Sequence, residues 1–413
     1  MESFKLTRIR NHFPDNSLKD IKGTIQKELH HLSSVIRRGS SIAIAVGSRG
    51  IDNLQLIVKE VVDFIIQQGA HPFIVPAMGS HGGATAEGQE EVLAGYGITG
   101  QTMGVPIRSS MEVVELQKGQ LSHRIFMDKN AYFADGIILI NKIKPHTDFQ
   151  ATYESGLVKM AVIGLGKEKG AEAIHHYGVH GLTKLIPASA SLIFAANKIL
   201  GGVALIENAY DKTMLVKAIA GNDILNEEPK LLELARANRP TFPVNDIDVL
   251  IIDQMGKNIS GVGIDTNLIG RIKIYGQKEP GAPAIKSIMV TDLTNESHGN
   301  ATGIGLADVI TRKLFNKIDF EITYKNISTS SFLERGKIPF IAENDADAFK
   351  LALRNSGNAA PGKERIIRIK DTLHLDELYV SEAILHEICN IPHIEQQEEQ
   401  VDIFDDNKTL IPF

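Results

Sequence analysis

Short apolar runs rich in β-branched residues alternate along the chain with longer segments of helical periodicity. Each run is four to seven residues long and is bounded by glycine or polar residues, which is typical of a buried strand. Such runs occupy residues 41–46, 73–77, 136–140, 249–252 and 287–290. Because strands that alternate with helices form parallel sheets with helices on their faces, the pattern predicts an α/β fold with mostly parallel sheets.

Helix signals fill the segments between these runs. Residues 54–68 carry apolar positions at helical spacing, and Gly69 follows them as a stop signal. Thr85 has a side chain suited to an N-cap, and we expect a helix from there through Leu93.

The pattern breaks at residues 238–243, where two prolines lie within four residues and preclude regular structure. We place a domain boundary there. Residues 1–240 are expected to form an N-terminal α/β domain, and residues 241–413 a second α/β domain that closes over an active site in the cleft between the two. The last ~35 residues could pack back on the first domain.

Composition and charge exclude several classes of protein. Hydrophobic residues make up 43% and charged residues 23%, the balance of an ordinary soluble globular protein. The net charge of -6 and the lack of a basic block argue against nucleic acid as a partner. The single cysteine, Cys389, excludes an internal disulfide and leaves imidazole or carboxylate as metal ligands. No signal sequence or membrane span is evident, so we expect a cytoplasmic protein.

Polar and glycine-rich loops follow four of the predicted strands. In open α/β sheets, ligands bind beyond the carboxyl ends of the strands, so these loops are where a site is expected. They place five side chains along such an edge: Arg49, His81, His146, Gln254 and Lys257. A single loop histidine or arginine is more often a surface or capping residue, but four loops in the same position favour a site.

Lys159 lies in an apolar, glycine-flanked segment, where burial would make its amine nucleophilic; the alternative is a lysine whose amine reaches the surface. The Gly164-Leu165-Gly166-Lys167 sequence lacks the remaining residues of a phosphate-binding loop. His176 and His180 have the spacing of a metal pair, but the glutamate of a zinc-hydrolase motif is missing. One of the three histidines of this segment, which are His175, His176 and His180, could still bind metal.

Together these segments resemble the nickel-pincer-dependent lactate racemase family over most of the chain. That family attaches its cofactor to a lysine and binds nickel through a histidine sixteen residues later, the spacing of Lys159 and His175 here. Its two catalytic histidines match His146 in a Lys-Pro-His sequence and His81 in a Gly-Ser-His sequence. A Gln-x-x-Lys pair in the second domain is matched by residues 254–257.

The resemblance implies a racemase or epimerase, an isomerase that inverts C2 of a 2-hydroxy acid. The C–H bond there is too weak an acid for simple deprotonation, and hydride transfer to and from the nickel-pincer nucleotide avoids a carbanion. His175 would bind Ni(II), and His81 and His146 would exchange the hydroxyl proton. Lys159 would carry the cofactor, and proteins that build the cofactor would be partners.

Further contacts are implied by the same resemblance. Ser48 and Arg49 would bind the cofactor, and the arginine could instead hold the substrate carboxylate. The remaining substrate contacts would come from the second domain, through Gln254, Lys257 and Asp253.

Several positions depart from the family pattern and argue against lactate itself as the substrate. Val46 and Gly50 replace the carboxylate and the proline of an Asp-x-Thr-Arg-Pro loop, and Asp253 stands in place of a tyrosine. The chain has no tryptophan, so an aromatic wall of the lactate pocket is lost. A roomier and more polar pocket, with Asp253 and Asp265, would suit a larger or more polar 2-hydroxy acid.

Two alternatives remain. A nicotinamide-dependent 2-hydroxy acid dehydrogenase would share the α/β pattern, but no Gly-x-Gly-x-x-Gly follows the first strand. A non-catalytic homologue that only binds the cofactor would not need His81 and His146.

Overall fold

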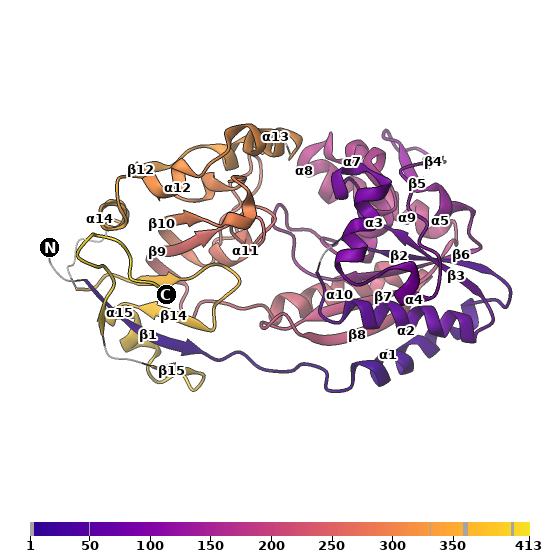
Figure 1. Ribbon diagram of the computed structural model, residues 1–413, viewed down its shortest axis with the longest axis horizontal. Coiled ribbons are helices and arrows are strands. Elements are labelled where there is room, and N and C mark those ends of the chain that lie inside the picture. The colour runs from indigo at the N-terminus through magenta and orange to yellow at the C-terminus, as the bar shows by residue number, and fades with distance from the viewer. Residues whose placement is uncertain (1–3, 49, 331, 358–361, 398–399) are drawn as a thin grey trace. The chain divides into compact units, whose positions relative to one another are not determined.

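A computed structural model describes residues 4–48, 50–330, 332–357, 362–397 and 400–413 (Figure 1). The chain divides into two compact units. One comprises Pro14–Arg239, and the other comprises Pro240–Phe413 together with the first thirteen residues. Both units are α/β, which confirms the predicted fold class; the main sheet of the first unit is mostly parallel, and the sheet of the second unit is mixed.

The Pro14–Arg239 unit is built on a five-stranded sheet of order β3-β2-β6-β7-β8. Its strands are β2 (Ser41–Val46), β3 (His71–Pro76), β6 (Gly136–Lys142), β7 (Ile199–Glu207) and β8 (Thr213–Ala220). The first four strands in that order are parallel, and only β8 is antiparallel to its neighbour. A two-stranded ladder of β4 (Val113–Leu116) and β5 (Ile125–Asp128) lies apart from this sheet.

Helices cover both faces of this sheet (Figure 1). The longer ones are α1 (Ile21–Leu29), α2 (Leu54–Gln67), α3 (Ala86–Gly95), α7 (Lys167–His175), α9 (Ile186–Ala195) and α10 (Ile224–Ala237), and the short ones are α4 (Gly100–Met103), α5 (Lys129–Phe133), α6 (Leu157–Lys159) and α8 (Gly178–His180). The predicted N-cap is present, since the Thr85 hydroxyl accepts a hydrogen bond from the Gly88 N–H at 3.0 Å. Buried residues of α1, α2, β2 and β6 form the core of the unit.

The second unit contains a nine-stranded mixed sheet of order β12-β11-β10-β9-β13-β14-β1-β15, with β16 also paired to β1. Its parallel strands are β9 (Asp246–Met255), β10 (Ala284–Leu293), β11 (Val309–Thr311), β12 (Phe340–Ala342) and β13 (Ile366–Ile369). The antiparallel strands are β1 (Lys5–Asn11), β14 (Glu377–Val380), β15 (Ile394–Gln396) and β16 (Val401–Asp402). The helices are α11 (Thr266–Ile269), α12 (Arg312–Asn316), α13 (Phe320–Ser330), α14 (Asp345–Asn355) and α15 (Glu382–Ile388).

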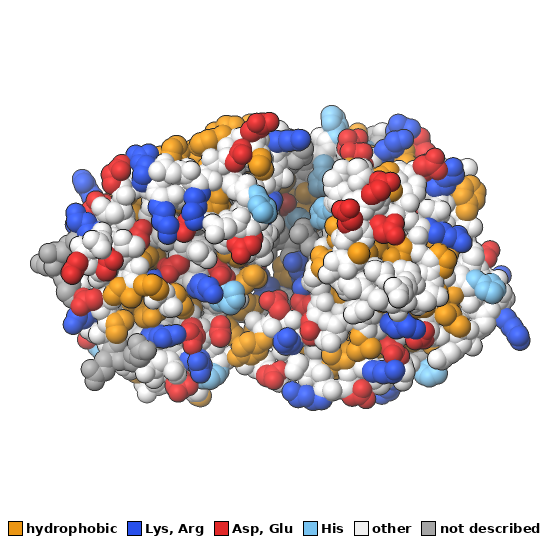
Figure 2. Space-filling model, in the orientation of Figure 1, with side chains coloured by type: hydrophobic (Ala, Val, Ile, Leu, Met, Phe, Trp, Pro, Cys, Tyr) orange, Lys and Arg blue, Asp and Glu red, His pale blue; other side chains and the backbone are white. Residues whose placement is uncertain are grey.

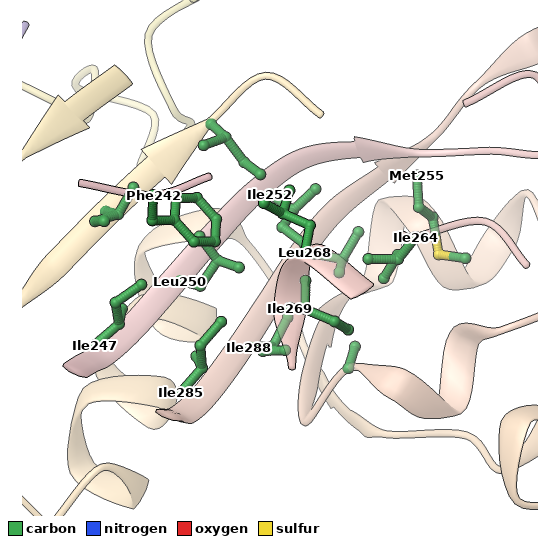
Figure 3. Close-up of a cluster of buried hydrophobic side chains, with 14 of the residues drawn as sticks. Phe242, Ile247, Leu250, Ile252, Met255, Ile264, Leu268, Ile269, Ile285 and Ile288 are labelled. Carbon is green, nitrogen blue, oxygen red and sulfur yellow. The ribbon is translucent and has the colours of Figure 1, made fainter. Parts of the chain in front are cut away.

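Side chains of β9 and β10 dominate the core of this unit, including Leu250, Ile252 and Ile288 (Figure 3). Every residue from Ile247 to Ile252 is buried, so β9 is a central strand covered on both faces. On the surface drawn in Figure 2, Lys and Arg side chains are interspersed with Asp and Glu, and neither sign dominates. No helix within the described ranges is long and apolar enough to cross a membrane.

The start of the chain differs from the expected division at residue 240. Strand β1 pairs with β14 and β15, so residues 1–13 belong to the second unit and not to the N-terminal domain (Figure 1). Within the last ~35 residues, β15 and β16 pair with β1 in the second unit. Ile9 at the centre of β1 is fully buried and supplies the apolar contact that holds the strand in that core.

Truncating Ile9 should therefore weaken the second unit. We expect Ile9→Ala to lower its free energy of unfolding by about 2–5 kcal/mol, because the change leaves a cavity in a closed core. Hydrogen exchange should become faster in peptides from residues 240–413 and stay unchanged in those from 14–239. Ile44→Ala in β2, a fully buried position of the other sheet, should give the reverse pattern. Faster exchange of residues 14–239 in Ile9→Ala would contradict the assignment of β1.

Candidate active site

Three loops of the Pro14–Arg239 unit leave the carboxyl ends of adjacent parallel strands. Ser48 follows β2, His81 follows β3 and His146 follows β6. Since β2 pairs with both β3 and β6, the three loops start from one edge of the sheet. Arg49, the fourth residue predicted at this edge, lies outside the described residues.

The loops after β2 and β3 are joined by a hydrogen bond between the Ser48 hydroxyl and Nδ1 of His81. The carbonyl of Ser48 accepts a further hydrogen bond from the Tyr96 hydroxyl at 2.7 Å. His81 is exposed, so its other ring nitrogen, Nε2, can reach a ligand. Gly82 has a φ of +64°, and a Cβ there would come within 2.6 Å of the backbone of Gly88. A larger residue at this position would push the His81 loop away from α3.

His146 is held from several sides. Its backbone N–H donates to Oε2 of Glu154 at 2.7 Å, and its ring stacks on Phe149 with centroids 4.6 Å apart. Nδ1 accepts a hydrogen bond from the Asp148 N–H at 3.1 Å. The other ring nitrogen, Nε2, lies 2.5 Å from Nζ of Lys159. The imidazole and the amine that were predicted from separate segments are therefore in direct contact.

Lys159 ends the short helix α6, and the chain continues into a π-helical turn over Met160–Gly164. Turns of this kind are rare in proteins, and those that occur often lie at functional sites. The lysine is half-buried, and Nζ also lies 6.0 Å from the Phe149 ring centroid. Of the two sequence interpretations, the structure favours an amine directed into the site, since Nζ contacts His146.

Glu228 supports the backbone just before Lys159, a role that no local sequence pattern indicates. Its carboxylate accepts from the Val158 N–H at 2.9 Å, and its side chain is 1% exposed. Burial raises the pKa of Glu228 to about 7, while hydrogen bonds from Val158 and Leu157 act in the opposite direction. A Cβ on Gly156 would lie 2.4 Å from this carboxylate, so glycine is required there.

His175, the last residue of α7, is close enough to Lys159 and Asp148 to respond to their charges. Burial lowers the pKa of His175, the Lys159 charge lowers it further, and Asp148 opposes both. A neutral imidazole is the form that binds a metal. No cluster of three or more His, Cys, Asp or Glu within the described ranges could hold a metal ion.

The remaining predicted residues belong to the second unit. Asp253 and Gln254, near the end of β9, line a cavity of about 660 Å³. Both carboxylate oxygens of Asp253 accept hydrogen bonds from Arg368, at 2.9 and 2.7 Å. Lys257 donates to the Gly261 carbonyl and to Asn326, at 2.6 and 2.7 Å.

Asp265 was expected to line a polar pocket. Instead, its side chain accepts from the Asn267 N–H at 2.8 Å and caps α11. Asp265 thus caps a helix of the second unit, and Asp253 is paired with Arg368 in the wall of the cavity.

No protein-family model and no curated protein matches the chain. Among solved structures, the lactate racemase apoprotein from Thermoanaerobacterium thermosaccharolyticum matches with a TM-score of 0.53 and 13% sequence identity, over 89% of this chain and 98% of that one. A protein from Thermotoga maritima matches with a TM-score of 0.48 and 15% identity, over 68% and 72% of the two chains. The chain thus has a lactate racemase-like fold, while the identity is too low for the match to establish more.

The raised pKa of Glu228 predicts a pH-dependent stability. The pKa of about 7 in the folded state exceeds the ~4.3 of an unfolded glutamate. The folded state therefore binds the proton more tightly, and this stabilisation is lost as the pH rises through 7. Relative to Glu228→Gln, the parent should lose about 2–3 kcal/mol between pH 5 and pH 8, measured by calorimetric unfolding.

Glu227→Gln is the matched control, because Lys217 holds the pKa of Glu227 at about 2 and the group does not titrate in this range. This control should keep the pH dependence of the parent. An equal difference between the parent and Glu228→Gln at every pH would contradict the assigned titration.

Proposed function

We propose that this protein is a racemase or epimerase that inverts C2 of a 2-hydroxy acid with a nickel-pincer nucleotide attached to Lys159. The observation that carries the proposal is the contact between the Lys159 amine and the His146 imidazole, with His175 within range of the lysine charge. His81 follows β3, and β2 separates β3 from β6, the strand that precedes His146. The lactate racemase-like fold supports this interpretation but does not by itself imply the activity.

The residues present fit the cofactor in two respects. Lys159 presents a half-buried amine for covalent attachment, and His175 presents an imidazole that burial keeps neutral for nickel. Ser48 and Arg49 remain candidates for further cofactor contacts. When bound, the cofactor would supply the hydride acceptor and donor, which is chemistry that no side chain of the protein can perform.

The two histidines would move the hydroxyl proton of the substrate. The Ser48 hydroxyl engages Nδ1 of His81, and the Asp148 N–H donates to Nδ1 of His146. We propose that Nε2 of each ring exchanges the proton with the substrate. One histidine accepts the proton and the other returns it on the opposite face, as inversion requires.

Substrate contacts are proposed for Arg49, Asp253, Gln254 and Lys257, which can bind a carboxylate and hydroxyl groups. We propose a substrate larger or more polar than lactate, because no tryptophan is present to form an aromatic wall. Proteins that build the cofactor are the partners that this function requires.

Covalent loading can be tested directly by intact mass and nickel content after production together with cofactor-building enzymes. The parent should carry an adduct and about one nickel per chain, and Lys159→Ala should carry neither. Lys169→Ala, at an exposed lysine of α7, should load like the parent. His175→Ala should lose nickel, and His176→Ala, at its exposed neighbour, should keep it. An unmodified parent, beside a lactate racemase that does load, would refute the proposal.

Turnover can be measured by chiral chromatography across a series of 2-hydroxy acids, from lactate to longer and more polar acids. His81→Ala and His146→Ala should retain the adduct and lose about 100- to 10,000-fold in rate, the usual contribution of a general acid or base. Inversion at the parent rate in either variant would exclude that histidine from catalysis. A loaded parent that inverts no substrate would instead identify a non-catalytic cofactor-binding protein.

A further inference from the structure

A lysine without any exposed surface lies behind the His81 loop. Lys167, at the first position of α7, is 0% exposed and has a φ of +55°. Its Nζ donates to the Pro76 carbonyl and to Oε1 of Gln89 at 2.9 Å, and lies 3.3 Å from Oδ2 of Asp128. Two of these oxygens accept hydrogen bonds from the ammonium group, and the Asp128 carboxylate supplies the opposite charge beside it. Burial lowers the pKa of Lys167 and raises that of Asp128, and the charge of each partner opposes this effect on the other. We take the pair as charged because Nζ faces oxygen atoms and each charge compensates the other.

The ammonium ion fixes the orientation of the Gln89 side chain, which is also fully buried. Lysine can only donate, so the amide oxygen of Gln89 must face it and the amide NH₂ must point the other way. That NH₂ donates to the carbonyls of Gly79 and His81, at 2.8 and 3.2 Å. The amide thus grips the backbone of the His81 loop at two points.

The same network connects the loop to other parts of the site. Pro76 is the last residue of β3, and the Gly79 N–H donates to the Gly164 carbonyl at 3.1 Å, in the turn that follows Lys159. Helix α7 runs from Lys167 to His175. A single buried charge therefore lies where the end of β3, the His81 loop and the helix that carries His175 meet.

We propose that Lys167 and Gln89 are positioning residues for His81: the ammonium orients the Gln89 amide, and the amide holds the loop that carries the imidazole. The catalytic part of this inference rests on the proposed function. The structural part, that Gln89 holds residues 79–85, does not. Misplacement of a catalytic group by about 1 Å costs up to about 100-fold in rate, so two hydrogen bonds to the loop can affect turnover strongly.

Gln89→Glu tests the proposal with a nearly isosteric change. The carboxylate can still accept from Lys167, but it cannot donate to the two loop carbonyls and repels them. Gln55→Glu is the matched control, because the Gln55 amide also donates to a backbone carbonyl, that of Gly97 at 3.0 Å, away from the His81 loop. Gln89→Met is the second variant, since it removes the donors without adding a charge.

For both Gln89 variants we expect kcat to fall by about 10- to 100-fold, with KM, adduct and nickel content unchanged. Amide exchange in residues 79–85 of the protein without cofactor should become about tenfold faster, since the loop loses two anchoring hydrogen bonds. Gln55→Glu should match the parent in every measurement. A merely structural role would instead lower the melting temperature and the loaded fraction and leave kcat of the loaded enzyme intact.

Gln89 variants with the kcat and the loop exchange of the parent would overturn the proposal. If the parent inverts no 2-hydroxy acid, the proposed function fails. Amide exchange in residues 79–85 is then the measurement that tests whether Gln89 holds the loop. Faster exchange confined to residues 79–85 would support the positioning of the loop, and unchanged exchange would overturn it.

Discussion

Parallel pairing of strands is the constraint on which the rest of the Pro14–Arg239 unit depends. Parallel neighbours must be joined by crossovers, so their carboxyl ends lie on one edge of the sheet. In this unit β2 is flanked by β3 and β6, and the loops after these strands carry Ser48, His81 and His146. The strand pairing alone therefore places residues about a hundred positions apart in the sequence at one edge of the sheet, and no direct contact between those residues is needed for this.

The strands themselves are covered by apolar side chains, while the loops at that edge are held by buried polar groups. Glu154 binds the backbone of His146, Glu228 the backbone before Lys159, and Gln89 the backbone around His81. Each of these groups is at most 1% exposed. A buried polar group with fixed partners allows few alternative arrangements of a loop, and its desolvation cost is offset only when those hydrogen bonds form.

This division explains how much could be predicted from the sequence. Continuous apolar runs such as residues 41–46 identify buried strands, and the loops that follow them identify the edge, because both are local patterns. Gln89 and Glu228 lie within polar stretches of helices, where their local pattern is that of a solvent-exposed face. Their burial depends on which loop packs against the helix. The membership of β1 in the second unit could not be predicted for the same reason, since its partners β14 and β15 lie more than 350 residues away in the sequence.

Lys159 and Lys167 show how the same side chain acquires different roles through its surroundings. Lys167 is fully buried with two oxygen acceptors and the adjacent Asp128 carboxylate, which oppose the effect of burial on its charge and make it a fixed donor. Lys159 is half-buried, and its amine contacts an imidazole and lies near an aromatic ring, surroundings that can satisfy a neutral amine because Nε2–H of the imidazole can donate to it. Only the second environment suits a nucleophile, because attack requires an unprotonated nitrogen that a ligand can reach. Sequence position cannot distinguish these two lysines eight residues apart, whereas the acceptors around each nitrogen do.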